Sequence, residues 1–462
     1  MQFNSFEFIF IFLPITFCVY FYLKSIKINS ASRVFLILAN LTFYSIWNIS
    51  YLPLIIGSVL FNYYIGLFLI ENRFKKKLVL IFGIFVNLLI LGYFKYTDFL
   101  IENYNILTSS EYELLHIALP LAISFFTFQQ IAYIVDCYRG NIRSYNFLNY
   151  ALFVTFFPQL IAGPIAYYKE IVPQFTDKKS GFKNYENIYR GLFIFAIGLF
   201  KKVIIADTFA VWANSGFDTS ATLTLLEAWS SSLSYTFQLY YDFSGYTDMA
   251  IGIGLLFNIK LPINFNSPYK ALNIQDFWRR WHITLSRFLK DYIYIPLGGS
   301  RRGEYKTYIN ILITFILAGI WHGAGWTFLF WGFLHGFGLI VYKIWSRFGV
   351  RLYSWLGWFI TFNFINITWV FFRAKNFDDA LRVLSGMVNF DLIGSYNLIN
   401  FSWIVVAMFA IFIANSNEII KSKISYRVVL SISSLLIFVS IFQLVNIIIA
   451  TNTITKFLYF DF

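Results

Sequence analysis

The sequence predicts an all-helical protein that crosses the membrane many times and forms a single integral membrane domain over residues 1–462. Hydrophobic residues make up 58% of the chain, charged residues 13%, and the mean hydropathy is +0.64. A spanning helix needs roughly 20 predominantly apolar residues, and such stretches recur along the whole sequence. The gaps between them are too short for a soluble domain of ordinary size.

The apolar stretches predict about 11–13 membrane segments once half-length and re-entrant segments are counted. They lie near residues 3–23, 33–51, 52–70, 78–95, 115–135, 147–168, 188–206, 228–257, 307–323, 325–342, 354–372, 401–416 and 428–450. The first segment, which has no basic region before it and no small-residue cleavage site after it, is expected to be retained rather than removed as a signal peptide.

The charged loops predict how the chain is oriented in the membrane. The net charge is +13, and the basic residues gather in short loops, which is the pattern of cytoplasmic loops rather than of a nucleic-acid surface. The loops around Lys24 and Lys75 are basic, whereas the loop after segment 78–95 is acidic. We therefore expect the basic loops in the cytoplasm and both termini outside it. The two cysteines, Cys18 and Cys137, support neither a disulfide framework nor a metal site.

Segment 147–168 cannot be an ordinary straight helix, because Pro158, Gly163 and Pro164 fall within seven residues. Its flanks are both basic, as at Arg143 and Lys169. A re-entrant hairpin that dips in from the cytoplasm satisfies both facts, since broken backbone is tolerated at membrane depth where protein surrounds it. A kinked ordinary span is the alternative.

His322 is the first candidate catalytic residue. It lies where segments 307–323 and 325–342 meet, beside Gly323 and Gly325, so two half-length spans would leave it inside the membrane. An ionisable group at that depth is costly and is a functional candidate by default. Imidazole also exchanges protons near neutral pH. The alternative is a neutral histidine that is hydrogen-bonded between helices.

Residues 273–290 predict one amphipathic helix, with apolar side chains at helical spacing and basic ones on its other faces. Two compatible interpretations remain. The helix could lie at the cytoplasmic surface among membrane lipid head groups. It could also line the mouth of a cavity, where its basic side chains would attract an anionic donor. They are Arg279, Arg280, Arg287 and Lys290. His282 lies within it and is the second candidate catalytic residue.

Asp242 and Asp248 lie in a largely apolar stretch, and buried carboxylates need partners. We expect them to orient an imidazole or to pair with an arginine of the amphipathic helix. His335, in an apolar helix beside Trp331, is expected to form a structural hydrogen bond.

Several motifs, taken together and in order, resemble the membrane-bound O-acyltransferases, in their bacterial branch. They are Pro158–Pro164 (PQLIAGP), Asp242–Asp248 (DFSGYTD), Phe277–Gly299 (FWRRWHITLSRFLKDYIYIPLGG), Trp321–Ala324 (WHGA) and Leu334–Gly336 (LHG). The resemblance implies helices around a central tunnel that crosses the bacterial cytoplasmic membrane. It also implies transfer of an acyl group, such as acetyl, from a cytoplasmic thioester to a hydroxyl on the far side. An extracytoplasmic partner protein usually completes this transfer to a polysaccharide.

The resemblance maps the family's characteristic histidine onto His322 and a second family position onto His282. We expect His322 to act as general base and His282 to orient groups or stabilise charge near the thioester carbonyl. A thioester from acetyl-CoA or an acyl carrier is already activated, so no metal or bound cofactor is expected. The candidate substrate- and donor-binding residues are Trp321, Asp242, Ser244, Asp248, Trp278, Arg279, Arg280 and Trp281.

Three other functions remain open from the sequence. The chain could transfer D-alanine to teichoic acid instead of acetyl to peptidoglycan or an alginate-like exopolysaccharide. It could be a transporter, since many helices, a broken segment and a central ionisable residue also suit that class. It could also be a scaffold subunit whose partner carries out the chemistry.

Overall fold

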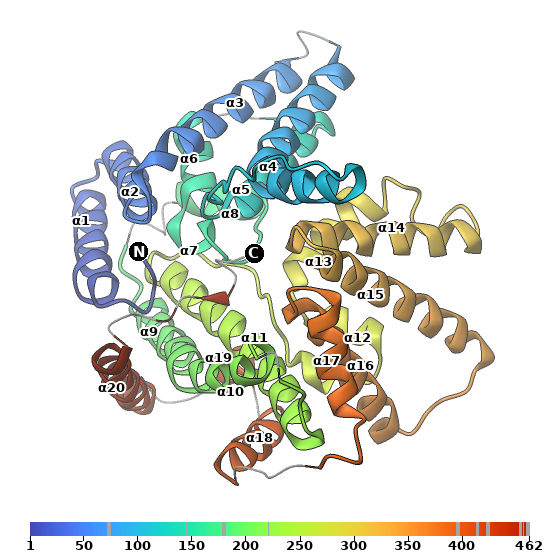
Figure 1. Ribbon diagram of the computed structural model, residues 1–462. Helices are drawn as coiled ribbons and strands as arrows, with labels where there is room; N and C mark the ends of the chain where they lie inside the picture. Colours follow the sequence, from blue (N-terminus) through green and yellow to red (C-terminus); the bar gives the residue numbers. More distant parts are fainter. Residues whose placement is uncertain are drawn as a thin grey trace.

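The computed structural model describes residues 1–71, 75–143, 146–177, 182–219, 221–393, 398–412, 415–421, 426–451, 455, 457 and 458. Throughout these ranges the regular secondary structure is helical, and the helices surround a common centre (Figure 1). The predicted all-helical fold is therefore confirmed. The predicted C-terminal end is described only at Phe457 and Leu458, and residues 459–462 lie outside the described part.

Six helical stretches among the described residues are long and apolar enough to cross a membrane. They are Glu7–Ser25, Ile49–Glu71, Lys76–Thr108, Trp326–Phe348, Ser354–Arg373 and Tyr426–Thr451. Other predicted segments are shorter, broken or more polar. Helix α11 (Leu225–Leu256), for example, carries two aspartates and is almost wholly buried by other helices, so it does not need an apolar surface of its own.

The N-terminal part forms one side of the ring in Figure 1. It contains η1 (Glu7–Phe12), α1 (Leu13–Ser25), α2 (Asn29–Ser45), η2 (Ile49–Tyr51), α3 (Leu52–Glu71), α4 (Lys76–Thr108) and α5 (Ile123–Tyr138). The predicted segment 115–135 is helical only from Ile123 onward. Its first residues are held in a loop because the backbone N–H groups of Leu115 and Ile117 donate to the carboxylate of Asp98.

The predicted break in segment 147–168 is present. The chain forms α6 (Phe147–Thr155) and the single turn α7 (Phe157–Leu160), then runs without a helix to α8 (Tyr168–Thr176). The stretch from Asn149 to Tyr168 is buried in protein, as non-helical backbone at membrane depth requires. Whether it enters and leaves on the cytoplasmic side stays a prediction.

A buried ion cluster joins the helices of the next part, which are α9 (Tyr185–Phe200), η4 (Lys201–Ala206), α10 (Asp207–Phe217) and α11. The ammonium group of Lys202 lies 2.8 Å from Asp207 and 2.7 Å from Asp242. Asp242 also accepts the backbone N–H of Leu458, and Asp207 accepts the hydroxyl of Thr455. The cluster therefore fastens the C-terminal segment to the middle of the molecule.

The expected partners of Asp242 and Asp248 were wrong. Neither carboxylate pairs with an arginine of the amphipathic segment or with an imidazole in the contacts between described residues. Asp242 pairs with Lys202, and Asp248 pairs with Lys201 at 2.7 Å and accepts the Ser416 hydroxyl. The physical reason is that α9 and η4 pack along α11 and bring two consecutive lysines to its carboxylates.

The C-terminal part contains η5 (Pro268–Lys270), α12 (Ile274–Arg280), α13 (Ile283–Leu289), η6 (Lys290–Tyr294), α14 (Glu304–His322), α15 (Trp326–Trp345), η7 (Ser346–Phe348), α16 (Ser354–Arg373), α17 (Phe377–Met387), α18 (Leu398–Ala410), α19 (Ser416–Lys421) and α20 (Tyr426–Thr451). It lies in two places in Figure 1: α12 to α17 form the other side of the ring, whereas α18, α19 and α20 lie beside α9 and α11.

The predicted pair of helices that meets at His322 is present as α14 and α15. The two helices cross very closely, because a Cβ on Gly319 would lie 2.3 Å from the carbonyl oxygen of Phe328, and one on Gly332 would lie 2.3 Å from that of Phe315. Close approach of this kind is typical of small residues in membrane helix pairs. The close crossing sets how α14 lies against α15, and therefore where the last residue of α14, His322, is placed.

Replacing Lys202 by Met should destabilise the protein by about 3–5 kcal/mol, because it leaves two buried carboxylates without their cation. Thermal unfolding of the detergent-solubilised protein measures the effect. Lys183→Met, which removes an exposed lysine, is the control. Adding Asp207→Asn and Asp242→Asn to Lys202→Met should restore part of the loss; an unchanged melting temperature in Lys202→Met itself would contradict the structural role of the cluster.

Candidate active site

His322 is the last residue of α14 and is only 4% exposed. Its imidazole lies among aromatic rings, with centroid distances of 4.8 Å to Trp321, 5.1 Å to Trp331 and 5.2 Å to Phe372. Gly323 continues in an extended conformation, so the helix ends immediately after the histidine. The ring is therefore held at the end of a helix, in a largely apolar interior.

The predicted single amphipathic helix over residues 273–290 was wrong. The chain forms two short helices, α12 and α13, and breaks between them at Trp281 and His282. His282 has φ 42° and ψ 54°, a left-handed conformation that is uncommon for a residue with a side chain and often marks a functional site. The break turns His282 inward, where it is fully buried.

Asn264 holds this break in place and also determines the tautomer of His282. Its Oδ1 lies 3.0 Å from His282 Nδ1, 3.3 Å from the backbone nitrogen of Thr284 and 2.9 Å from the Thr284 hydroxyl. A backbone N–H can only donate, so the atom that faces it must be the amide oxygen. His282 Nδ1 must then donate as well, which leaves the lone pair of the neutral ring on Nε2.

The broken segment after α7 supports the same network from the other side. The backbone N–H of Ile165 donates to the Thr284 hydroxyl over 3.0 Å. Nearby, Arg287 of α13 donates to the carboxylate of Glu170 of α8 from both terminal guanidinium nitrogens, Nη1 and Nη2, at 2.6 and 2.9 Å. The motif that ends at Pro164 and the motif that contains His282, which are far apart in the sequence, thus form one structural unit.

The two candidate catalytic histidines meet at Trp321. Its ring centroid lies 4.8 Å from that of His322 and 6.4 Å from that of His282. The indole is stacked on Phe128, with centroids 4.9 Å apart. Its Nε1–H is buried and has no hydrogen-bond acceptor among the described residues. A buried donor of this kind is rare in native structures and could serve a substrate.

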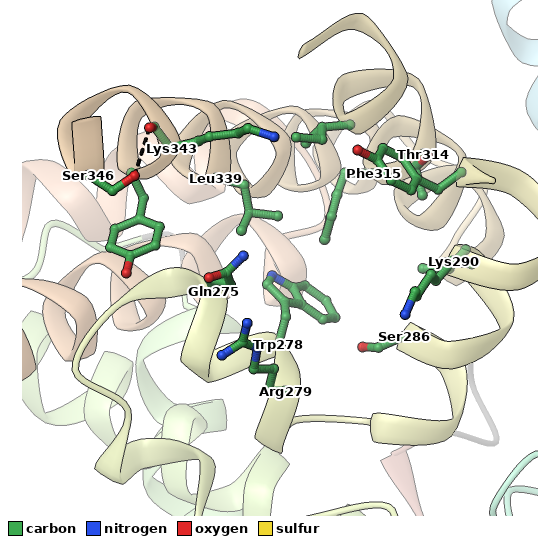
Figure 2. Close-up of a pocket in the computed structure, with 14 residues that line it drawn as sticks. Gln275, Trp278, Arg279, Ser286, Lys290, Thr314, Phe315, Leu339, Lys343 and Ser346 are labelled. Carbon is green, nitrogen blue, oxygen red and sulfur yellow. Dashed lines mark hydrogen bonds between the residues drawn. The ribbon is translucent and has the colours of Figure 1, made fainter. Parts of the chain in front are cut away.

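A pocket of about 350 Å³ lies between α12 and α13 on one side and α14 and α15 on the other (Figure 2). Trp278 lies within it, and Phe315 and Leu339 point toward the indole from the opposite helices (Figure 2). Three basic side chains also line the pocket, namely Arg279, Lys290 and Lys343. Positive charge at the edge of an apolar pocket favours a ligand with an anionic group.

Trp278 also links this pocket to the aromatic cluster around His322. Its indole N–H donates to His335 Nδ1 over 3.2 Å, which confirms the structural hydrogen bond expected for His335. The ring of Trp278 lies 6.0 Å from that of Trp331, which contacts His322. Two aromatic side chains, Trp278 and Trp331, therefore lie between the pocket and the imidazole of His322.

The other predicted binding residues do not line this pocket. Arg280 pairs with Asp276 at 2.9 Å, and Trp281 is buried in an aromatic cluster with Phe277 and Trp369. Ser244 is buried on α11. The motif at 242–248 contacts the site through a residue that the sequence did not indicate, because the ring of Phe243 lies 4.8 Å from that of His282.

Asn264 was also missed by the sequence analysis, and so was Lys343 as a pocket residue, whereas Lys290 belongs to the basic set expected at a cavity mouth. A signal for Asn264 does exist, since it lies in the non-helical stretch 259–267 just before the amphipathic segment. Such a stretch needs side chains that satisfy its backbone. The sequence contains no indication of which distant donors Asn264 would bind.

Replacing Asn264 by Leu should lower stability by about 1–3 kcal/mol, because it leaves the buried N–H of Thr284 and the ring of His282 without their acceptor. The melting temperature in detergent tests this. Asn363→Leu is the matched control, since the amide of Asn363 bonds only within its own helix in the contacts between described residues. Equal melting temperatures for the two variants would contradict a role for Asn264 in holding the break.

Comparison with known proteins identifies the family. The sequence model of the membrane-bound O-acyltransferase family matches residues 41–374, which include both histidines. A peptidoglycan O-acetyltransferase of Helicobacter pylori is 54% identical over 420 residues, covering 84% of this chain and 80% of the relative. A probable alginate O-acetylase of Pseudomonas aeruginosa is 41% identical over 400 residues, covering 84% and 75%.

A more distant relative covers only part of the chain. A teichoic acid D-alanyltransferase of Bacillus subtilis is 28% identical over 274 residues, which is 56% of this chain and 69% of the relative. The family match over most of the chain and the similarity of the first two relatives show that this integral membrane protein belongs to the membrane-bound O-acyltransferase family and is an acyltransferase.

Proposed function

We propose that this acyltransferase transfers an acetyl group from a thioester on the cytoplasmic side to a hydroxyl of peptidoglycan outside, with His322 as the general base. The observation that carries the proposal is that two buried histidines lie against Trp321, close to a basic pocket. The indole N–H of Trp321 has no acceptor within the described part of the chain. The similarity to acetyl-transferring relatives supports the choice of acyl group.

The proposed chemical step is a simple acyl substitution. His322 accepts the proton of the acceptor hydroxyl as the hydroxyl oxygen attacks the thioester carbonyl. The carbon–sulfur bond then breaks, the new ester carries the acetyl group, and the departing thiolate takes up the proton. The Nε1–H of Trp321 can donate to the carbonyl oxygen as negative charge develops on it.

The geometry favours one of the two roles expected for His282. Its Nδ1–H is committed to Asn264, so the neutral ring offers only an acceptor at Nε2. It can orient a hydroxyl or thiol proton in that state, whereas stabilising the carbonyl oxygen by donation would first require protonation of the ring. We therefore assign His282 an orienting role next to His322.

The basic pocket is the proposed entry of the thioester donor. Arg279, Lys290 and Lys343 can hold the phosphates of acetyl-CoA or the acidic surface of an acyl carrier, and Trp278 marks the inner end of the pocket. The basic loops that flank these helices are the ones predicted to face the cytoplasm. Arg279 is exposed, so it could also contact lipid head groups.

Peptidoglycan is the proposed acceptor because the peptidoglycan O-acetyltransferase shares 54% of aligned residues, compared with 41% for the alginate O-acetylase. An alginate-like exopolysaccharide is the second candidate. The D-alanyl-transferring relative aligns with only 56% of the chain, which makes D-alanyl transfer less favoured. The proposal places the enzyme in the bacterial cytoplasmic membrane, with both termini outside, together with an extracytoplasmic partner that completes the transfer.

Replacing His322 by Ala should lower acetyl transfer by at least about 10²-fold, the usual contribution of a positioned general base. Base-releasable acetate is measured in purified cell wall and, separately, in exopolysaccharide, from cells with wild type, a deletion or the variant. His116→Ala, at an exposed histidine, is the control. Loss of acetate from the cell wall alone supports the proposal. Wild-type acetate in His322→Ala would refute the assignment, and wild-type acetate in the deletion would favour D-alanyl transfer or transport.

Replacing Arg279 and Lys343 by Gln should raise the KM for the donor, by up to about fivefold per charge, the upper limit for an exposed ion pair. The kcat should change little, because these residues lie at the pocket and not beside His322. Steady-state transfer in vesicles at low and high salt provides the test. Arg351→Gln removes an exposed charge that does not line the pocket; if it raises the KM equally, the pocket is not the donor site.

A further inference from the structure

Lys95, a residue of the membrane helix α4, contacts the backbone on which His322 is carried. Its ammonium nitrogen lies 2.5 Å from the carbonyl oxygen of Trp321 and 3.0 Å from that of His322. It also lies 6.0 Å from the centre of the Trp321 ring. The lysine is 226 residues away in the sequence from the nearer of these carbonyls.

Two further side chains of α4 form hydrogen bonds with the same turn. The hydroxyl of Tyr96 donates to the carbonyl oxygen of Ile320 over 2.6 Å. Asn103, two turns farther along α4, accepts the indole N–H of Trp326 over 2.8 Å. These contacts lie before and after His322 in the sequence, so α4 binds both the end of α14 and the start of α15.

The end of α14 needs such partners for a physical reason. The last carbonyls of a helix have no N–H of their own helix to bind, and they form the negative end of the helix dipole. At membrane depth water does not replace the missing donors. Lys95 is partly buried, and an ionisable group at membrane depth commonly pairs with backbone carbonyls. Among the described residues, Lys95 forms no ion pair with a carboxylate, so the carbonyls at the end of α14 supply its compensation.

We propose that Lys95 is a positioning residue for catalysis: by binding the carbonyl oxygens of Trp321 and His322, it fixes the backbone at the end of α14 and thereby the place of the His322 imidazole. The inference rests on the proposed role of His322 as general base. Lys95 itself remains on the backbone side of the turn and exchanges no proton with the substrate.

The proposal predicts a particular kinetic effect. Without the ammonium group, two buried carbonyls lose their donor, and the turn that carries both His322 and Trp321 can shift. A displacement of about 1 Å can reduce the rate of a positioned reaction by about 10²-fold. Donor binding should be spared, because the residues that line the basic pocket come from the chain between α12 and η7, and its lining includes no residue of α4.

The experiment compares Lys95→Met, which keeps the length of the side chain but removes its charge, with Lys95→Arg, which keeps a cation and its N–H donors. Lys77→Met, at an exposed lysine on the same helix, is the matched control. In Lys95→Met we expect the kcat for acyl transfer to fall by about 10- to 100-fold with the donor KM within twofold of wild type. In Lys95→Arg we expect at least a third of the wild-type kcat.

Amide hydrogen exchange of residues 319–326 supplies a measurement that does not depend on the reaction. Faster exchange in Lys95→Met, with a lower kcat and rescue by Arg, supports the proposal. It is overturned if kcat stays within twofold of wild type, if the exchange is unchanged, or if the Arg variant is as slow as the Met variant. His322→Ala is assayed alongside: full activity in that variant would overturn the proposed base, whatever Lys95 does.

Discussion

A helix that ends inside the protein is the constraint on which much of this structure depends. Helix α14 stops at His322, so the carbonyls of its last turn have no N–H donor within their own helix. Lys95 and Tyr96 of α4 supply donors to three of them. The close crossing of α14 with α15 then determines how the turn is placed. The position of the candidate base therefore depends on the side chains that bind the carbonyls at the end of α14.

A second interruption produces the other half of the site by the same physics. The chain between α12 and α13 leaves the helical path at His282, and Asn264 accepts the donors that this break exposes. The non-helical segment after α7 binds the same network through Ile165 and Thr284. Two interrupted segments therefore meet at Trp321, and a third binds one of them through Thr284. Side chains that satisfy backbone groups also orient the imidazole, so structural and functional roles fall on the same residues.

Several buried charged side chains of this protein form ion pairs that join helices, whereas the basic side chains of the pocket are open to solvent. Lys202 with Asp207 and Asp242 joins η4, α10, α11 and the C-terminal segment, and Lys201 with Asp248 joins η4 and α11 near Ser416. Such pairs offset the large cost of removing ions from water. The basic residues of the pocket lie where solvent can reach them and remain able to bind an anionic ligand. Charge in the interior thus holds helices together, whereas charge at the pocket remains available for the proposed donor.

The sequence by itself determined the class of fold, the break around Pro158–Pro164, the helix pair that meets at His322 and the two candidate histidines. These are local properties, since hydropathy, proline and glycine act on the few residues around them. Only the tertiary structure decided that Asp242 and Asp248 pair with lysines, that residues 273–290 form two helices, and that Asn264 and Lys95 support the histidines. A polar group buried in a membrane protein takes whichever partner the packing of distant helices brings within reach, and that choice is not encoded in its neighbours along the chain.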